Sequence, residues 1–440
     1  MRLSAETPLP ASVQAPGYDR ASQAAGIAHI GIGAFHRAHQ AVYTDDAMGA
    51  GERDWGIVGV SLRSPGVAAQ LNPQDGLYTV STRSAAGTGL RLIGAVQKVL
   101  VAADEPQAVI DAIAASPTHI VSFTVTEKGY LRRSDGTLDL DAAKGPSSLY
   151  RFIGAGLSAR KAKGLPGLTL LSCDNLANNG AVLKALMRQY LAVEYPVLVD
   201  WFDRECRCPA TMVDRIVPAT TNADRAAIEA ELGVRDEGAV VTEGFSQWVI
   251  EDDFAGPRPR WEKVGAQLVA DVAPYETAKL RMLNGAHSAL AYIGLGAGHD
   301  YVYQAIADPA IRPLIERLMR DEAAPTIDAA PGQDLAAYAD ALMDRFANPA
   351  LDHRLIQIAM DGSQKIPQRW LETLAWHQAR GARCSSLEAA IAAWIAFLRS
   401  DHPIDDPLAD KLRAVAAATD AMQMLFGEGG LIASGWRPEI

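Results

Sequence analysis

The sequence predicts an α/β fold in which an N-terminal domain, built on a parallel β-sheet with an inserted hairpin, is followed by a mainly α-helical C-terminal domain. Three observations predict this fold. Short apolar strands alternate with amphipathic helices in the first half, a turn-rich segment joins two further strands, and helical spacing replaces strands after Pro274. The length of 440 residues also favours two domains over one.

The first half alternates apolar, β-branched runs with longer helical stretches, which is the pattern of a parallel sheet covered by helices. The predicted strands cover residues 26–32, 55–62, 119–126, 168–173 and 240–250. The predicted helices cover residues 34–50, 107–115 and 180–193. Residues 77–83 and 90–101 are joined by the turn-rich residues 84–89, which predicts a hairpin inserted into this domain.

Beyond Pro274 the apolar residues follow helical spacing and strand character is lost. The predicted helices cover residues 276–295, 312–319, 335–346, 371–379, 387–397 and 412–425. A Gly-Pro-Arg-Pro-Arg loop at residues 256–260 precedes this change. We therefore expect one domain at residues 1–270 and a second at residues 271–440.

The charge balance favours a small-molecule partner. The formal net charge is −11 and the isoelectric point is about 5.3, whereas a surface for nucleic acid or an anionic membrane would need clustered Lys and Arg. No apolar run approaches the ~20 residues that cross a bilayer, and the N-terminus lacks the layout of a secretory signal. We expect a cytoplasmic protein that is a monomer or a weak homo-oligomer.

The four cysteines indicate neither disulfides nor a metal site. They are too few and too scattered for a disulfide framework, which favours a reducing compartment. Cys206 and Cys208 lack the C-x-x-C spacing and the second pair of a structural zinc site, so we expect no metal.

The first predicted strand runs into a glycine turn that opens a helix. Such a turn lets the backbone approach a dinucleotide pyrophosphate, and the helix N-terminus offers N–H groups and a positive dipole to the anion. The spacing is G-x-G without a third glycine, so an ordinary tight turn is the alternative. A Thr-Val-Thr sequence at a later strand end favours a Rossmann-type nucleotide domain. The residues expected to contact the cofactor are Gly31, Gly33, Ala34, Phe35, Thr124 and Thr126.

The second strand bears on the choice between NAD and NADP. An acidic residue is expected at its end, where it would bind the ribose hydroxyls of NAD and repel the 2′-phosphate of NADP. The strand ends instead in Arg63 and Ser64. Arg63 could accept that phosphate, stack on the adenine or point to solvent. We expect NAD, with Arg63 near the adenosine, and NADP stays open.

Residues 275–287 carry the most informative polar pattern. On an α-helix, Glu276, Lys279, Asn284 and His287 share one side, with apolar residues interleaved as in the wall of a cleft. Hydride transfer from a secondary alcohol needs a base for the hydroxyl proton and donors for the developing alkoxide. A lysine with a lowered pKa can be that base without a metal. The pattern also fits an ordinary helix face with a Glu276–Lys279 ion pair and a core histidine.

Six stretches spread over nearly the whole chain resemble the polyol-specific long-chain dehydrogenases. This family includes mannitol 2-dehydrogenase, arabinitol dehydrogenase and the hexuronate enzymes fructuronate and tagaturonate reductase. The stretches are GIGAFHRAHQ at 31–40, TVTE at 124–127, SCDN and NG within 172–180, MVDRI at 212–216, KLRMLNGAH at 279–287 and DGSQK at 361–365. The resemblance implies a zinc-independent, NAD(P)-dependent oxidoreductase. The chain departs from the family in its short length and in the missing acidic residue of the second strand.

The resemblance also implies roles for single residues. Lys279 would be the general base, Asn175 and Asn284 would stabilise the oxyanion, and His287 would contact the reacting oxygen. Glu276 would pass the proton to solvent. The pattern Asn-Leu-Ala-Asn-Asn leaves two neighbouring asparagines as competitors for the first of these oxyanion roles.

Two further residues are implied to bind the substrate. Asp214 and Lys365 would line its site from opposite domains, although Asp214 also fits a turn cap or a salt bridge and Lys365 also fits a surface position. The expected reaction is hydride transfer between NAD(H) and a secondary alcohol or ketone of an open-chain sugar derivative. D-mannonate/D-fructuronate is favoured slightly over mannitol/fructose or arabinitol. Arg354 and Arg369 are candidates to bind the carboxylate of a sugar acid.

Two other functions stay as alternatives. A nucleotide-binding sensor would keep the fold without needing a preorganised base such as Lys279. A zinc alcohol dehydrogenase would be inactivated by chelators, which we do not expect here.

Overall fold

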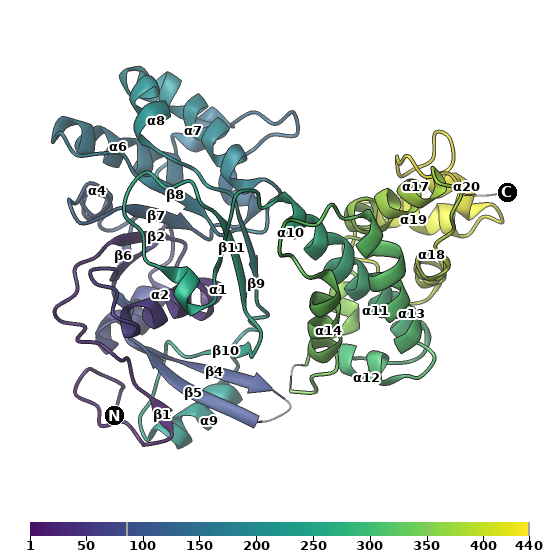
Figure 1. Ribbon diagram of the computed structural model, residues 1–440, viewed down its shortest axis with the longest axis horizontal. Coiled ribbons are helices and arrows are strands. Elements are labelled where there is room, and N and C mark those ends of the chain that lie inside the picture. Colours follow the sequence, from purple (N-terminus) through teal and green to yellow (C-terminus); the bar gives the residue numbers. More distant parts are fainter. Residues whose placement is uncertain (85–86, 351, 439–440) are drawn as a thin grey trace. The chain divides into compact units, whose positions relative to one another are not determined.

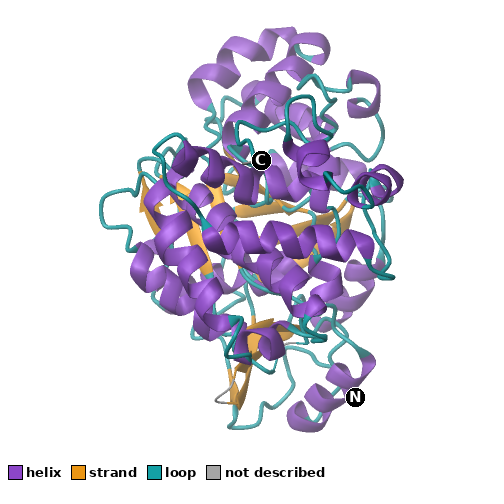
Figure 2. Cartoon of the chain, turned by 90° about the vertical axis from the view of Figure 1, so that its right-hand side faces the viewer, coloured by secondary structure: helices purple, strands orange, loops and turns teal. Residues whose placement is uncertain are grey.

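The computed structural model describes residues 1–84, 87–350 and 352–438, and it divides into two units, Met1–Val272 and Ala273–Ile440 (Figure 1). All described strands, orange in Figure 2, belong to the first unit. The described residues of the second unit form helices and loops. The predicted fold class, a Rossmann-type N-terminal domain and a mainly helical C-terminal domain, is confirmed. Within the described residues, no helix is long and apolar enough to cross a membrane.

The main sheet of the first unit has five parallel strands in the order β6-β3-β2-β7-β8. Their bounds are Val96–Val101 for β6, Ile57–Ser61 for β3, Ile27–Ile30 for β2, Ile120–Phe123 for β7 and Thr169–Ser172 for β8. The chain begins this sheet at its centre and extends it first to one side and then to the other. The strand order therefore reverses between β2 and β7, which is where Rossmann-type sheets bind nucleotides.

Apolar residues on both faces hold this sheet between two helical layers. Ala28 and Ile30 of β2 pack with α4, α6 and α7, whereas Ile27 packs with α2 on the other face, because successive strand residues point to opposite sides. The layers are visible in Figure 1. The helix bounds are Ala34–Ala38 for α1, Gln40–Gly49 for α2, Gly66–Leu71 for α3, Pro106–Ile113 for α4, Leu140–Ala143 for α5, Leu149–Ala162 for α6, Asn179–Glu194 for α7, Val199–Glu205 for α8 and Asn222–Leu232 for α9.

The predicted hairpin is present and forms a second sheet. Its strands, β4 (Tyr78–Ser84) and β5 (Gly87–Ile93), pair antiparallel. Two turn residues of the prediction, Ala85 and Ala86, lie outside the described residues. The sheet order is β1-β5-β4-β10, with β1 at Val13–Gln14 and β10 at Val240–Glu243. A third sheet contains β9 (Thr211–Asp214), β11 (Gln247–Glu251) and β12 (Gln267–Val269).

Two predicted strands were wrong because each is two strands in different sheets. Residues 90–101 divide into β5 and β6 at Gly94, whose carbonyl accepts a hydrogen bond from Arg20 Nε at 2.7 Å. A Cβ atom at Gly94 would lie 2.6 Å from the Arg20 side chain, so the chain bends where this arginine enters. Residues 240–250 divide into β10 and β11 around Gly244. A continuous apolar run does not reveal such a change of sheet.

The predicted helix 34–50 was also wrong, because it breaks at His39, where φ is −122° and ψ is −94°. His39 Nε2 lies 2.9 Å from Gln247 O, and its ring packs on Phe35 and Trp248. These tertiary contacts override the local helical pattern.

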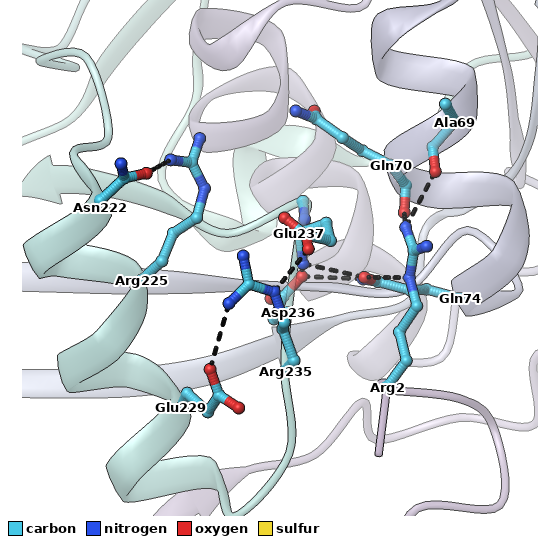
Figure 3. Close-up of polar contacts among 11 residues, drawn as sticks. Arg2, Ala69, Gln70, Gln74, Asn222, Arg225, Glu229, Arg235, Asp236 and Glu237 are labelled. Atoms are coloured by element: carbon cyan, nitrogen blue, oxygen red, sulfur yellow. Dashed lines mark hydrogen bonds and ion pairs between the residues drawn. The ribbon is translucent and has the colours of Figure 1, made fainter.

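A polar cluster joins the N-terminus to the hairpin sheet (Figure 3). Gln74 Oε1 accepts from Arg2 Nε at 3.0 Å and from the Glu237 N–H at 2.9 Å, while its Nε2 donates to Asp236 Oδ1 at 2.8 Å. Asp236 also accepts from the Gly238 N–H at 2.8 Å. The cluster fixes the backbone around Gly238. The Gly238 carbonyl in turn accepts a hydrogen bond from Arg37, which also donates to Gly33 O in the glycine turn.

The second unit is built around α11 (Gly285–Gly296), which packs against α12, α15 and α18. A Cβ atom at Gly294 would lie 2.7 Å from a Leu355 methyl and 2.8 Å from Ala305 Cβ, so glycine allows this close packing. The other α-helices are α10 (Ala273–Ala278), α12 (Val302–Ala307), α13 (Arg312–Arg317), α14 (Leu335–Phe346), α15 (Leu355–Ile358), α16 (Gly362–Ile366), α17 (Glu372–Gln378), α18 (Ser385–Arg399), α19 (Ala409–Ala416) and α20 (Ala421–Phe426).

Three segments of this unit are π-helical: η5 (Lys279–Asn284), η6 (Leu318–Ala323) and η8 (Pro367–Leu371). The prediction of one regular α-helix over residues 276–295 was therefore wrong, since the hydrogen bonds of a π-helix span five residues and its turns are wider. At η8 the cause is Pro367, which lacks an N–H and conflicts with the carbonyl four residues back.

The predicted helix 412–425 was wrong as well, because α19 ends at Ala416 and α20 begins at Ala421. Arg399 donates from Nε to Ala416 O at 2.6 Å and from Nη2 to Ala418 O at 3.1 Å. The guanidinium thus satisfies carbonyls at the helix end, which stabilises the break.

Candidate active site

The turn after β2 requires glycine at position 31. Gly31 has a φ of 94°, and a Cβ atom there would lie 2.1 Å from Thr124 O. Its N–H donates to Val60 O at 2.8 Å, which joins the turn to β3. At Gly33 a Cβ atom would meet nothing closer than Gly31 O at 3.9 Å. The first glycine is therefore needed by the fold, and the second leaves the space before α1 open.

A cavity of about 750 Å³ lies beyond the carboxyl ends of β2, β3 and β7. Ala34 and Phe35 do not line it and pack partly against the apolar core. Its charged lining residues are Arg63 and Lys128, and no described carboxylate lines it. The volume, the open glycine turn and the positive lining fit a dinucleotide with its pyrophosphate. Five of the residues predicted to contact the cofactor line the cavity, namely Gly31, Gly33, Arg63, Thr124 and Thr126.

Thr124 also holds the glycine turn from behind. Its Oγ1 donates to Gly31 O at 2.6 Å and lies 2.9 Å from His29 Nε2. His29 Nδ1 lies 2.8 Å from Ser122 Oγ, which donates to Gln40 Oε1 at 2.8 Å. Burial lowers the pKa of His29 to about 3, so the ring is neutral at physiological pH. This buried network fixes the point where the strand order reverses.

Asp174 is a residue of this site that the sequence analysis missed. Its carboxylate accepts from the Val125 N–H at 3.1 Å, from the Thr126 N–H at 2.8 Å and from the Tyr130 hydroxyl at 3.0 Å. Burial raises its pKa, and these three donors oppose that shift. The available signal was its place two residues after the end of β8, which lies next to β7 in the parallel sheet.

The bonds to Asp174 hold Thr126 in an unusual conformation. Thr126 has a φ of 64° and a ψ of 164°, a region that β-branched residues rarely adopt and that costs about 1–3 kcal/mol. The strained backbone lines the candidate cofactor cavity. Strain of this kind persists only where surrounding contacts fix it, and Asp174 supplies two of them.

Arg37 is a second missed residue, from the Phe-His-Arg-Ala-His-Gln stretch. It is buried, its Nε donates to Gly33 O at 3.3 Å and its Nη1 donates to Gly238 O. The Tyr78 hydroxyl donates to Arg37 O at 2.8 Å. Arg37 therefore ties the glycine turn to the hairpin sheet.

The two other predicted site residues of the first unit lie at or just beyond strand ends. Asn175 is exposed after β8, and Asp214 is the buried last residue of β9. Asn179, which competed with Asn175, is buried: its Nδ2 donates to Asp174 O and Thr211 O, and its Oδ1 accepts from the Thr211 N–H. Its amide is thus occupied by structural bonds. Asn178, the other competitor, is exposed at the start of α7.

The predicted catalytic residues of the second unit lie around the π-helix η5. Lys279 begins it, Asn284 ends it, and both are half-buried, as is Glu276 of α10. His287 in the first turn of α11 is 9% exposed, and its ring centroid lies 4.8 Å from that of Phe346. The wide turn changes the angles expected from an α-helix, so their shared face cannot be taken from sequence spacing.

His287 is held as a neutral imidazole. Burial, then the charges of His353, Arg345 and Arg369, lower its pKa well below the ordinary value. A neutral ring keeps both a donor and an acceptor for a hydroxyl or carbonyl oxygen. Within the described residues, no group of His, Cys, Asp and Glu side chains is arranged to hold a metal ion.

Lys365 lies in α16 and is half-buried. Its Nζ donates to Met360 O at 2.6 Å. Burial and the positive charge of Arg369 lower its pKa, while Asp361 and other nearby carboxylates oppose this shift. Of the arginines considered for a sugar acid, Arg354 is exposed and lies over the Tyr301 ring, whereas Arg369 contacts α11.

Comparison with known proteins gives matches along nearly the whole chain. The family model of the mannitol dehydrogenase Rossmann domain matches residues 25–263. The family model of the mannitol dehydrogenase C-terminal domain matches residues 271–426. D-mannonate oxidoreductase of Escherichia coli (strain K12) is 41% identical, over 96% of this chain and 91% of that protein. Mannitol 2-dehydrogenase of Phaeosphaeria nodorum is 37% identical, over 95% of this chain and 78% of that protein.

Two solved structures match with high TM-scores. The Pseudomonas fluorescens mannitol 2-dehydrogenase in ternary complex with NAD and D-mannitol gives a TM-score of 0.83 at 37% identity, covering 99% of this chain and 93% of that chain. A D-sorbitol dehydrogenase in substrate-free form gives 0.91 at 32% identity, covering 95% of this chain and 91% of that chain.

Proposed function

The chain belongs to the mannitol dehydrogenase family, and on that premise we propose that it interconverts D-fructuronate and D-mannonate with NAD(H). As a family member it is an NAD-dependent oxidoreductase acting on the CH–OH groups of a polyol or sugar acid. The choice of the sugar acid is supported by the higher identity to the D-mannonate oxidoreductase, 41%, than to the mannitol 2-dehydrogenase of Phaeosphaeria nodorum, 37%.

The observation that carries the catalytic assignment is the sequence of polar groups around η5. Lys279 and Asn284 are half-buried at its two ends, and His287 follows as a buried, neutral imidazole. A binding sensor has no use for an amine, an amide and a neutral imidazole within nine residues of one helix. A dehydrogenase needs a proton-transfer group, a donor to the oxygen and an orienting contact.

In the proposed mechanism Lys279 transfers the proton at the reacting oxygen. The bound nicotinamide cofactor supplies or accepts the hydride. During reduction, protonated Lys279 donates its proton as the carbonyl oxygen becomes a hydroxyl, and during oxidation neutral Lys279 removes that proton. Asn284 and Asn175 donate hydrogen bonds to the developing oxyanion. His287 orients the oxygen, Glu276 exchanges the proton with solvent, and Asp214 and Lys365 bind the remaining hydroxyls.

The cofactor assignment in this proposal is NAD. The cavity provides Arg63 and Lys128 and no described carboxylate, so the feature that normally repels the 2′-phosphate of NADP is missing from its lining. Arg63 is exposed and, within the described part of the chain, forms neither a hydrogen bond nor an ion pair. We therefore expect NADPH to be accepted, while the similarity to a mannitol 2-dehydrogenase solved with NAD supports NADH as the preferred cofactor.

A substrate panel followed by the absorbance of the reduced nicotinamide tests the proposal. D-fructuronate, D-tagaturonate, D-fructose and D-xylulose are each assayed with NADH and with NADPH. We expect the highest kcat/KM for D-fructuronate with NADH. A higher kcat/KM for D-fructose would instead assign mannitol 2-dehydrogenase activity. Tight NADH binding without turnover of any of the four would favour the sensor.

A further inference from the structure

Arg369 in the π-helix η8 contacts the end of the π-helix η5 and the first turn of α11. Its Nη1 donates to Ser288 Oγ at 2.7 Å and to Asn284 O at 3.3 Å. The neighbouring Trp370 Nε1 donates to Gly285 O at 3.0 Å. The guanidinium is therefore fixed at the turn of α11 that also carries His287.

The charge of Arg369 has no partner of opposite sign. Within the residues that the structure describes, it forms no ion pair, whereas Arg281 of the facing π-helix pairs with Glu372 at 2.8 Å. Burial lowers the pKa of Arg369 to about 10, and only the phenol of Tyr292 opposes that shift. A half-buried guanidinium without a carboxylate keeps an uncompensated positive charge, and this charge favours an anion at any donor edge that is left free.

One edge of this guanidinium is open. The two hydrogen bonds use Nη1, and no described residue accepts from Nε or Nη2. Both atoms are accessible to solvent. The Nε–Nη2 edge presents two parallel N–H donors, which is the geometry that binds a carboxylate through two hydrogen bonds.

The surroundings of Arg369 point to an anion rather than to a neutral hydroxyl. Its positive charge contributes to the lowered pKa of His287 and of Lys365, so it lies near both residues. Lys365 precedes it by four positions, close to one helical turn. Asp361, Asp406 and Asp405 act on the pKa of Lys365, but none of them acts on the pKa of Arg369, so the positive charge of Arg369 stays uncompensated.

We propose that the open Nε–Nη2 edge of Arg369 binds the carboxylate of a sugar-acid substrate and makes Arg369 the residue that selects the acid over a neutral ketose. This inference rests on the proposed function, since it presumes turnover of D-fructuronate. A neutral ketose of the same length offers one hydroxyl where the acid offers two charged oxygens. Arg369 therefore contributes to acid binding and leaves the hydride step at the ketone to other residues.

Steady-state kinetics of Arg369→Gln with D-fructuronate and D-fructose tests the proposal. Removal of the charged fork is expected to lower kcat/KM for D-fructuronate on the order of 30-fold, mainly through KM, because charged hydrogen bonds are roughly twice as strong as neutral ones. The value for D-fructose is expected to stay within about threefold. Arg369→Lys, which keeps the charge but loses the fork, should give an intermediate loss for the acid alone.

Arg380→Gln is the matched control, because Arg380 is exposed, lies over the Trp376 ring and has no part in the proposed machinery. It should leave both substrates unchanged. An equal loss for both substrates in Arg369→Gln and Arg369→Lys, with unaltered melting temperature, would assign Arg369 a purely structural role and overturn the inference. No loss for either substrate in these variants would also overturn the inference.

The wild-type rates separate this inference from the proposed function. If wild-type protein turns over D-fructose but not D-fructuronate, the proposed substrate is wrong and the inference falls with it. If it turns over D-fructuronate and the Arg369 variants keep the wild-type preference, the proposed function stands and only the inference is wrong.

Discussion

The wall of the cofactor cavity and the helical turns around η5 differ in how their buried polar groups are satisfied. In the first region, Thr124 and Asp174 are saturated by neighbouring groups of the same unit. In the second, Arg369 keeps an open donor edge, and His287 forms no hydrogen bond through its ring among the described residues. Thr124 and Asp174, whose bonds are completed within the fold, suit a constant cofactor, whereas open donors suit a substrate that completes them.

The largest expected effect concerns the second region. Lys279→Met removes the proposed proton-transfer group and should lower kcat on the order of 10³-fold, since general acid–base groups contribute about 10²–10⁴. The steady-state rate with D-fructuronate and NADH measures it. Lys411→Met, at an exposed position of α19, is the control and should retain the wild-type rate. A Lys279→Met rate within tenfold of wild type would remove the contrast between the regions.

The next largest effect is expected on NADH binding at the wall of the cofactor cavity. Gly31→Ala places a Cβ atom 2.1 Å from Thr124 O at a φ of 94°, so the turn must move. We expect NADH affinity to fall by roughly tenfold or more, because the displaced backbone lines the cavity. Quenching or enhancement of NADH fluorescence measures the affinity. Gly256→Ala, where a Cβ atom meets nothing within 4 Å, should bind NADH normally. Equal affinity of Gly31→Ala and wild type would contradict a cofactor at this turn.

Asp174→Asn should have a smaller effect on the same wall. The amide keeps one acceptor oxygen for the three donors, and Thr126 loses part of the support for its strained backbone. The free energy of unfolding should fall by about 2–3 kcal/mol, and KM for NADH should rise several-fold. Denaturant unfolding and initial rates measure the two quantities, with the exposed Asp104→Asn as the control. An unchanged KM for NADH would mean that Asp174 stabilises the fold without affecting cofactor binding.

The last effect is shared by both regions and concerns stability, with no change expected in the catalytic residues. The pKa values of the buried His29 and His36 in the first unit and of His287 in the second are lowered, in each case mainly by burial. Below the unfolded value of about 6.5 the unfolded chain binds more protons than the folded protein, so stability falls as pH falls. For His29 this window extends down to a pKa of about 3.

The expected slope is at most about 1.4 kcal/mol per pH unit for each of these histidines. Denaturant unfolding between pH 7.5 and pH 5.5 measures it, a range above the titration of most carboxyl groups. A free energy of unfolding that is flat or rises toward pH 5.5 would mean that the rings are not buried as neutral groups.

The first region was the more predictable from sequence. Alternating apolar runs and the G-x-G turn predicted four of the five parallel strands and five of the cavity-lining residues, whereas β6 was predicted only as part of one hairpin strand. The hydrogen bonds from Val125 and Thr126 to Asp174 were missed, because they depend on β8 lying beside β7. They also depend on a positive φ at Thr126, which is not expected for a β-branched residue. The strand breaks at Gly94 and Gly244 depend likewise on tertiary partners.

The second region resisted prediction for a different reason. Spacing on an ideal α-helix identified Lys279, Asn284 and His287 as candidates but assumed a regularity that the π-helix removes. The open edge of Arg369 could not be inferred from sequence, because it depends on η8 packing against η5 and α11. Arg354 and Arg369 look equivalent in the sequence, and only their contacts separate them.

The separation of cofactor binding from proton transfer is tested most directly by titrating the Lys279→Met variant with NADH. We predict a dissociation constant within about twofold of wild type for a variant whose turnover is lost, because Lys279 lies in the second unit and the cofactor cavity is lined by the first. A folded variant that no longer binds NADH, or one that binds it and turns over D-fructuronate at the wild-type rate, would contradict the assignment of Lys279.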